Sequence, residues 1–159
     1  MAKLKEYNGH YCEWEFEHAF IGFLEAEGWK YSSGNDISRA NRREVLIDKD
    51  FKSFIAESNP DLSQEDVSRI YDRVRLVGSE SDFATLHKVY GWMADGLQFV
   101  PEKGSARMLA LIDFENPSKN IFRVVNQFTI EYTNNGQSQT RRPDVLLFVN
   151  GMPLCIVEL

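Results

Sequence analysis

Two carboxylates flank a predicted β-hairpin near the end of the sequence. Asp144 follows Pro143 and precedes an apolar strand, and Glu158 ends the strand that returns after the turn residues Asn150 and Gly151. Two carboxylates at the end of a hairpin repel each other unless a divalent cation lies between them. Mg²⁺ suits this place, because it binds one or two carboxylates together with waters and a phosphate oxygen. The spacing therefore predicts a magnesium site that could activate water and neutralise charge on a phosphoryl group.

The length of the turn decides whether the two carboxylates share a face of the sheet. A two-residue turn pairs Val149 with Met152, and side-chain alternation then sends Asp144 and Glu158 to opposite faces. A three-residue turn pairs Val149 with Pro153 and brings Asp144 opposite Glu158. The metal site therefore requires the longer turn or a β-bulge near Asp144.

A helical part, about 13–96, precedes the sheet that carries these carboxylates. Apolar residues at spacings of three and four, as in Phe16, Phe20 and Phe23, are typical of helices with one buried face. Together with capping and stop signals they predict four helices, Glu13–Glu27, Asp48–Glu57, Gln64–Arg75 and Ser81–Ala94.

A sheet part, about 107–159, follows. Short apolar runs predict strands at Met108–Phe114, Asn120–Tyr132, Arg142–Val149 and Leu154–Leu159. The last two should form the hairpin, because Asn-Gly is a strong signal for a tight turn. Since the sequence stops within the last predicted strand, we expect a C-terminally truncated fragment with a single domain over residues 1–159.

The composition excludes several classes of protein. With 18 Lys and Arg against 24 Asp and Glu, the net charge is −6, which argues against gripping nucleic acid by bulk charge alone. The sequence holds no apolar run long enough for a membrane span or a secretion signal, so no membrane partner is expected. Two cysteines, Cys12 and Cys155, are too few for a disulfide framework, which favours the cytoplasm.

The C-terminal string RRPDVLLFVNGMPLCIVEL, residues 141–159, resembles the nuclease motif in the restriction (R) subunit of type I restriction-modification enzymes. That family reads R-x-D, an apolar run, N-G-x-P-L, a second apolar run and E-x-K. Upstream, residues 13–31 resemble the first helix of the family, and Ile112–Phe114 and Asn126–Phe128 fall where similar segments lie. The resemblance covers most of the chain and is weakest between Ser32 and Ser105.

This resemblance implies an α/β fold with the PD-(D/E)xK core of many restriction endonucleases, in which a mixed β-sheet is flanked by helices and here carries a helical insert. Asp144 and Glu158 would be the catalytic metal ligands. Glu17 on the first helix would be the third ligand, with Glu13 as the second choice for that place. The lysine of the motif would lie two residues after Glu158, beyond Leu159, so the 159-residue chain alone is expected to be inactive.

Three further side chains have open alternatives. Arg141 and Arg142 could bind DNA phosphates or protect a strand edge from pairing. Gln127 could point into the site or lie on the sheet surface. Glu13 and Glu17, without a metal, would be solvated acidic residues in the first turns of a helix, where the helix dipole favours them.

The function implied is that of a type I site-specific deoxyribonuclease, with Mg²⁺-dependent hydrolysis of double-stranded DNA in the N-terminal domain of the R subunit. ATP would bind only to motor domains outside this chain, because no G-x-x-x-x-G-K-[ST] loop occurs in it. The partners would be DNA and the modification (M) and specificity (S) subunits. Two alternatives stay open, a non-catalytic docking module between the motor and those subunits, and a PD-(D/E)xK nuclease of DNA repair.

Overall fold

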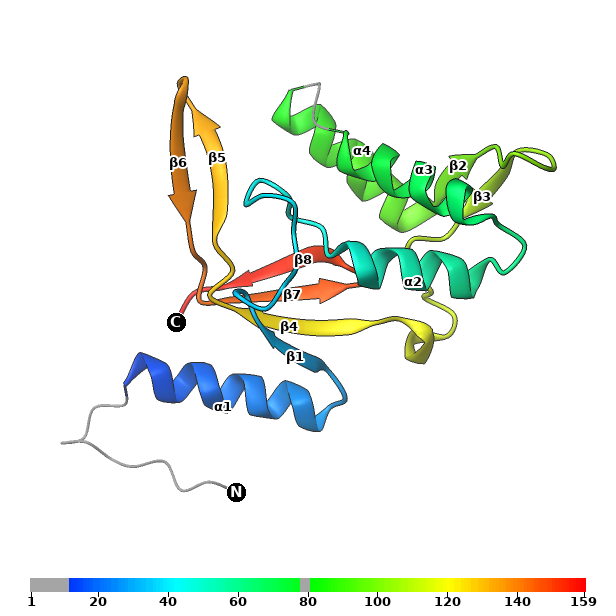
Figure 1. Ribbon diagram of the computed structural model, residues 1–159. Coiled ribbons are helices and arrows are strands. Elements are labelled where there is room, and N and C mark those ends of the chain that lie inside the picture. Colours follow the sequence, from blue (N-terminus) through cyan, green and yellow to red (C-terminus); the bar gives the residue numbers. More distant parts are fainter. Residues whose placement is uncertain (1–11, 78–80) are drawn as a thin grey trace. The chain divides into compact units, whose positions relative to one another are not determined.

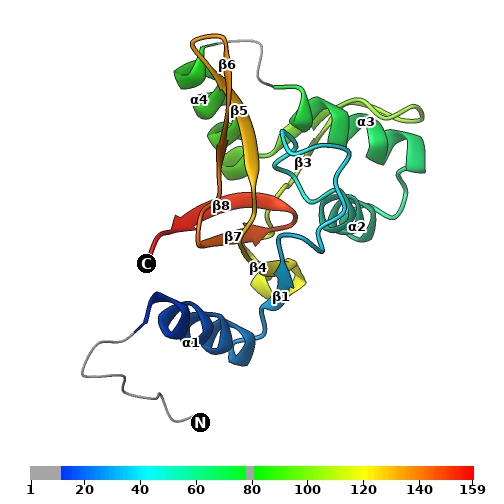
Figure 2. The same cartoon turned by 60° about the vertical axis from the view of Figure 1, so that its left-hand side comes forward.

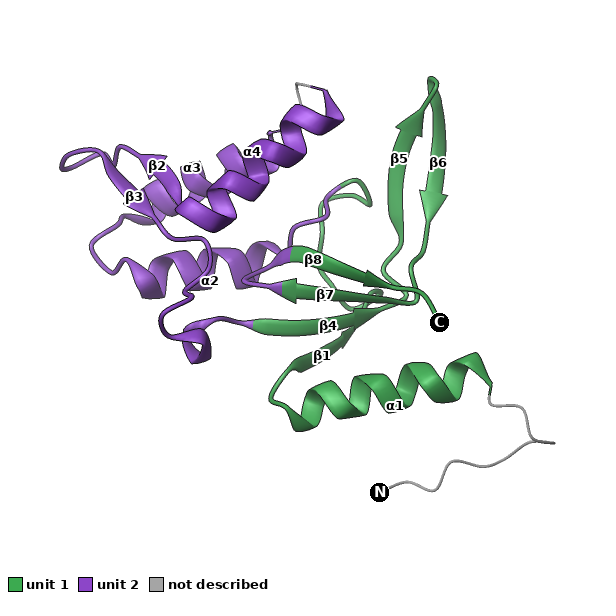
Figure 3. Ribbon diagram, turned by 180° about the vertical axis from the view of Figure 1, so that it is seen from behind, with its two compact units in different colours: residues 1–43, 122–148, 153–159 green, residues 44–121, 149–152 purple. Residues whose placement is uncertain are grey.

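A computed structural model describes residues 12–77 and 81–159, which fold as a mixture of helices and strands (Figure 1, Figure 2). The chain divides into two compact units (Figure 3). Unit 1 comprises residues 1–43, 122–148 and 153–159, and unit 2 comprises residues 44–121 and 149–152. The α/β class expected from the sequence is therefore confirmed, with four α-helices in the described part of the chain.

Unit 1 is built on a four-stranded sheet and one helix. The helix is α1 (Glu13–Ala26), and the strands, in the order in which they lie side by side, are β1 (Lys30–Ser33), β4 (Phe122–Asn126), β7 (Val145–Val149) and β8 (Met152–Val157). β1 and β4 run parallel, whereas β7 and β8 are joined by a tight turn and so run antiparallel, which makes the sheet mixed.

A small apolar core joins the helix to the sheet in unit 1. Ile21 and Leu24 of α1 pack on Val124 of β4 and Val145 of β7, and all four are buried. The helix reaches this sheet because Gly28, in a left-handed conformation with φ 91°, ends it and turns the chain into β1.

The β7–β8 turn has two residues rather than three. Asn150 and Gly151 have φ values of 50° and 75°, as a type I′ hairpin turn requires. The sequence-based alternative of a three-residue turn is therefore wrong, because this backbone conformation suits the right-handed twist of both strands with two residues alone. Asp144 and Glu158 can therefore share a face of the sheet only if the hairpin contains a β-bulge.

A second hairpin in unit 1 uses the same kind of turn. β5 (Ile130–Asn134) and β6 (Gln137–Arg141) pair in register from Ile130 with Arg141 to Asn134 with Gln137. Their turn residues, Asn135 and Gly136, have φ values of 50° and 76°.

Unit 2 is mainly helical. It contains α2 (Asp48–Ser58), α3 (Gln64–Arg75), α4 (Asp82–Asp95), the antiparallel pair β2 (Leu97–Phe99) and β3 (Arg107–Leu109), and the short 3₁₀ helix η1 (Pro117–Lys119). Its core holds fully buried side chains from α2, α3 and both strands, among them Phe51, Phe54, Ile70, Leu97 and Leu109. None of the helices that the structure describes is long and apolar enough to span a membrane.

Asn150 is a buried structural residue of unit 2. Its amide donates to the carbonyl of Leu111 over 2.9 Å and to Oδ1 of Asn120 over 2.8 Å, and its own Oδ1 accepts from the N–H of Ile121 over 2.7 Å. Every polar atom of this side chain is thereby satisfied, which a buried amide needs. The Asn-Gly of the N-G-x-P-L element therefore serves the fold.

The helices lie where the sequence predicts them, whereas several strands differ. The predicted strand Asn120–Tyr132 is interrupted after β4, because Gln127 takes a left-handed conformation with φ 55°. The predicted strand Met108–Phe114 shortens to β3. β1, β2 and β6 were not predicted. β1 and β6 are mainly polar, and the alternation of Leu97, Gln98 and Phe99 in β2 covers only three residues.

Candidate functional site

The carboxylate of Glu17 is held inside unit 1. Glu17 is only 6% exposed, although it lies in the second turn of a helix whose first turn is solvated. Nδ2 of Asn126 donates to its Oε1 over 2.6 Å, and Nε2 of Gln127 donates to its Oε2 over 3.2 Å. Oδ1 of Asn126 in turn accepts from the hydroxyl of Tyr31 over 3.1 Å. A buried carboxylate is therefore positioned by two neutral amides at the end of β4.

Gln127 links this carboxylate to the segment that carries Asp144. Its backbone N–H donates to the carbonyl oxygen of Asp144 over 3.1 Å, while its side chain reaches Glu17. The left-handed backbone of Gln127 ends β4 at this point and is uncommon for a residue other than glycine. Of the two alternatives for Gln127, the side chain is thus directed to Glu17 rather than lying on the open sheet surface.

Asp144 and Glu158 make separate contacts. Oδ2 of Asp144, a half-buried residue directly before β7, accepts from the backbone N–H of Leu159 over 2.9 Å. Oε1 of Glu158 lies 2.8 Å from Nη2 of Arg141 in an ion pair whose two side chains are both largely exposed. An exposed pair of this kind contributes only about 0–1 kcal/mol to stability, so it can exchange partners.

The predicted ligands do not form a ready-made metal cluster. Among residues 12–77 and 81–159, no three Asp, Glu, His or Cys side chains lie together as a metal-binding group. The donors are nevertheless of the type that suits Mg²⁺, which is a hard cation and needs only one or two carboxylates beside water and phosphate. Glu13 and Arg142 both lie exposed, at the start of α1 and between β6 and β7 respectively.

The packing of Val157 bears on the register of the hairpin. Val157 packs against the same apolar core as Val145 and Leu147, which lie on the α1 side of β7. In an unbroken hairpin with a two-residue turn, Val157 would lie opposite Asp144, whose side chain points to the other side of the sheet from Val145. A one-residue bulge in β8 would account for the observed packing, because it moves all later residues to the opposite face.

Sequence reasoning named Gln127 as a possible site residue but missed Asn126, the second partner of Glu17, and Tyr31, which contacts Asn126. Asn126 and Tyr31 come from β4 and β1, and the contact from Asn126 to Glu17 spans 109 positions of the chain. The signal that could have found Asn126 is a polar residue that directly follows Val124 and Val125, both fully buried. A polar residue buried at the end of such a strand needs a polar partner.

The sequence matches a known family over most of its length. Residues 13–159 match the family described as type I restriction enzyme R protein N terminus. The chain is 34% identical over 167 positions to a protein of Methanocaldococcus jannaschii assigned as the type I restriction enzyme MjaIXP endonuclease subunit, a match that covers 99% of this chain and 15% of that protein.

A second relative comes from a different organism. The chain is 29% identical over 159 positions to the type I restriction enzyme HindI endonuclease subunit of Haemophilus influenzae, covering 91% of this chain and 14% of that protein. The chain thus spans about 15% of the length of the first relative and 14% of the second.

Proposed function

Because the chain belongs to the family of type I restriction enzyme R protein N termini, we propose that it is the endonuclease part of a restriction subunit. The reaction is Mg²⁺-dependent hydrolysis of phosphodiester bonds in double-stranded DNA, without sequence recognition by this chain. The core that performs it is of the PD-(D/E)xK type. Both relatives are named as endonuclease subunits, which supports this assignment.

The observation that carries the proposal is the double contact of Gln127. Through its side chain and its backbone N–H, this residue joins the carboxylate of Glu17 to the backbone of Asp144. Asp144 in turn contacts the backbone next to Glu158. Gln127 thereby links the carboxylate of Glu17 to the backbone of Asp144, and Asp144 is linked to the backbone beside Glu158, which supports a shared site.

Asp144 and Glu158 would hold the metal ion, and Glu17 would support it from α1. Bound Mg²⁺ supplies an activated water and neutralises charge that develops on the phosphoryl group. Arg141 pairs with the carboxylate of Glu158 and can exchange that weak contact for a DNA phosphate. Gln127 and Asn126 keep the carboxylate of Glu17 oriented by hydrogen bonds to both of its oxygens.

The setting of this activity is proposed from the relatives. The chain would act in the cytoplasm, within a complex of the R subunit with modification and specificity subunits, and ATP would be used by motor domains outside this chain. Membership of the restriction family argues against the third alternative, a nuclease of DNA repair.

A docking module remains the second candidate, and one observation favours it. Phe83, Leu86 and Tyr90 of α4 are exposed and lie three and four residues apart, so they form an apolar stripe along one side of that helix. Exposed apolar stripes of this kind often contact another protein. Docking by unit 2 is compatible with catalysis by unit 1. The alternative to the nuclease is a docking module that has no metal site.

Metal binding in the absence of nucleotide separates these two candidates. Calorimetric titration of the protein with Mg²⁺ and with Mn²⁺ should show a carboxylate-dependent site that Asp144→Asn removes. The matched control is Glu25→Gln, which deletes the charge of an exposed carboxylate on α1. Equal heats of binding for Asp144→Asn and the unsubstituted protein would favour the docking module.

A further inference from the structure

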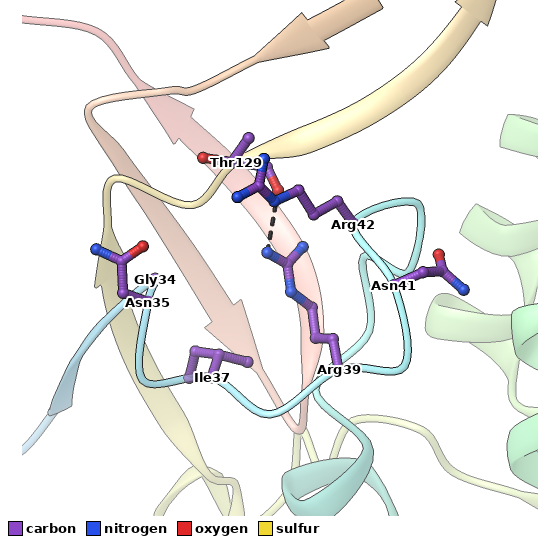
Figure 4. A pocket seen from close by; sticks show the side chains of 7 residues that line it. All are labelled: Gly34, Asn35, Ile37, Arg39, Asn41, Arg42 and Thr129. Carbon is purple, nitrogen blue, oxygen red and sulfur yellow. Dashed lines mark hydrogen bonds between the residues drawn. The ribbon is translucent and has the colours of Figure 1, made fainter. Parts of the chain in front are cut away.

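Unit 1 contains a polar pocket of about 220 Å³ that is separate from the carboxylates (Figure 4). Asn35, Arg39, Asn41, Arg42 and Thr129 are among the residues that line it. Three of the residues between positions 34 and 43 are arginines, Arg39, Arg42 and Arg43, against one acidic residue, Asp36. In a chain with a net charge of −6, this is a local concentration of positive charge.

The pocket lies at the carboxyl ends of the two parallel strands. Gly34 directly follows β1, and its N–H donates to the carbonyl of Asn126, the last residue of β4, over 2.8 Å. A Cβ atom on Gly34 would come within 2.6 Å of the Cα atom of Phe128, so only glycine permits this close approach. The carboxyl ends of parallel strands are the usual place for ligands in α/β sheets.

A hydrogen bond and a ring contact orient Arg39 in the pocket. Its Nη2 donates to the carbonyl oxygen of Thr129 over 3.0 Å, which is drawn as a dashed line in Figure 4. Its guanidinium carbon lies 3.9 Å from the centroid of the Phe128 ring, and Phe128 is fully buried. Stacking on a ring combined with a hydrogen bond holds the guanidinium plane in one orientation.

Arg42 brings a second guanidinium to the same place. Figure 4 shows its side chain reaching toward Thr129, as that of Arg39 does, while the side chain of Asn41 is directed elsewhere. Nη1 of Arg42 lies 3.9 Å from Oε1 of Glu131, and the Arg42 side chain is 61% exposed. Because exposed ion pairs at this distance are weak, an incoming anion can replace Glu131.

Two guanidinium groups directed to one pocket favour the binding of an anion there. Phosphate suits them, because its tetrahedral oxygens accept paired N–H groups from more than one arginine. The backbone of unit 1 also ties the pocket to the proposed site, since Gln127 and Thr129 belong to one short segment after β4.

We propose that Arg39 and Arg42 form a binding site for a phosphate group of the DNA backbone. That the phosphate belongs to DNA, rather than being free in solution, rests on the proposed function. The bound phosphate would align a duplex along the segment Gln127–Thr129, next to the carboxylates. No base is read, so the contact strengthens binding equally on all sequences.

The test is equilibrium binding of the protein to short fluorescent DNA duplexes, measured by anisotropy in EDTA so that no cleavage occurs. Arg42→Ala should weaken binding by about 10-fold, the amount expected for one charged hydrogen-bonding contact. It should also reduce the slope of log K against log salt by about 0.9, because one phosphate contact is lost. Both changes should be the same for two unrelated sequences.

Arg43→Ala is the matched control, because it removes the same charge from the same loop but Arg43 does not line the pocket. It should leave affinity and salt slope close to those of the unsubstituted protein. Arg42→Lys should restore the salt slope but only part of the affinity, since an ammonium lacks the paired donors of a guanidinium.

Two outcomes would contradict the proposed phosphate site. One is an equal loss of affinity in Arg42→Ala and Arg43→Ala, and the other is the absence of DNA binding by the unsubstituted protein at low salt. Inorganic phosphate could also compete equally well with DNA for Arg42→Ala and for the unsubstituted protein. That result would mean that phosphate binds at another place. Because these assays contain no metal, they succeed or fail independently of the metal titration with Asp144→Asn.

Discussion

Nδ2 of Asn126 lies 2.6 Å from Oε1 of Glu17, so a strand residue and a helix residue share a buried hydrogen bond at the end of β4. Oδ1 of the same asparagine accepts a hydrogen bond from the hydroxyl of Tyr31. Asn126 therefore satisfies a tyrosine donor and a carboxylate acceptor at once. Burying a carboxylate without such donors costs free energy, so a substitution that removes this amide should destabilise unit 1.

Asn126→Asp should destabilise the protein by about 2–4 kcal/mol at pH 7, because it replaces the donor to Glu17 by a second negative charge. The acceptor for Tyr31 is kept, so the loss reports on the contact with Glu17. Urea unfolding of both proteins at pH 7 measures the difference.

The control for that substitution is Asn134→Asp at the exposed end of β5, which adds the same charge outside the core. It should change the free energy of unfolding by less than about 1 kcal/mol. If both variants lose the same stability at pH 7, the hydrogen bond to Glu17 is not what Asn126 contributes.

Gly151→Ala should destabilise unit 2 far more than Gly136→Ala destabilises the β5–β6 hairpin. Both glycines hold the second position of a type I′ turn, with φ values of 75° and 76°, so both substitutions incur the same backbone penalty, about 1–2 kcal/mol. A Cβ atom on Gly151 would in addition clash with the backbone oxygen of Ile47 and lie 2.8 Å from the nitrogen of Phe51.

A Cβ atom on Gly136 meets nothing within 4 Å. We therefore expect Gly151→Ala to cost at least about 3 kcal/mol, measured as a shift in the urea midpoint beside Gly136→Ala. An equal loss of stability in the two variants would mean that the residues around Gly151 make room for a Cβ atom at no cost in free energy.

The sequence predicted the helices well because their signals are local. The α3 range Gln64–Arg75 was predicted to the residue, since Ser63 caps it by accepting the N–H of Asp66 and apolar residues recur at helical spacing. In α1 the pattern predicted the helix but not which of its faces is buried. Phe16 and Phe23 are exposed, whereas Glu17 and Ile21 are buried, because a helix that is apolar on several sides does not reveal its core.

The strands and the site were harder to predict, since their causes lie far apart in the sequence. β6 is exposed throughout and polar, and it forms because the turn at Asn135 and Gly136 pairs it with β5. The break at Gln127 has no local signal, since a left-handed conformation is rare for that residue type. The motif singled out Asp144 and Glu158 as candidates, whereas the contact of Asn126 with Glu17 could come only from the fold.

Acid should reduce the stability of unit 2 through Asp66. Burial disfavours its charged form, but the N–H of Glu102, the hydroxyl and N–H of Ser63 and the nearby Arg69 outweigh this and lower its pKa below the ordinary value. Because the folded pKa is the lower one, the stabilisation is present at neutral pH and is lost as the pH falls below about 4 through the folded pKa.

Asp66→Asn should accordingly be less stable than the unsubstituted protein at pH 7, and it should lose less stability between pH 7 and pH 3. Urea midpoints at the two pH values provide the comparison, with Asp72→Asn as an exposed control in the same helix. A pH dependence that is the same with and without the Asp66 carboxylate would show that acid acts elsewhere.

DNA cleavage by the complex that contains this chain tests the central claim most directly, with Asp144→Asn compared with Glu25→Gln in a plasmid assay that also records ATP hydrolysis. Asp144→Asn keeps the shape of the side chain and removes the charge that would hold Mg²⁺. We predict that it lowers the cleavage rate by at least about 10²–10³-fold, as expected when one main electrostatic contact to the transition state is lost. ATP hydrolysis should be unchanged, because this chain holds no phosphate-binding loop, and Glu25→Gln should cleave normally. Cleavage by Asp144→Asn at the rate of the unsubstituted protein would contradict the nuclease assignment.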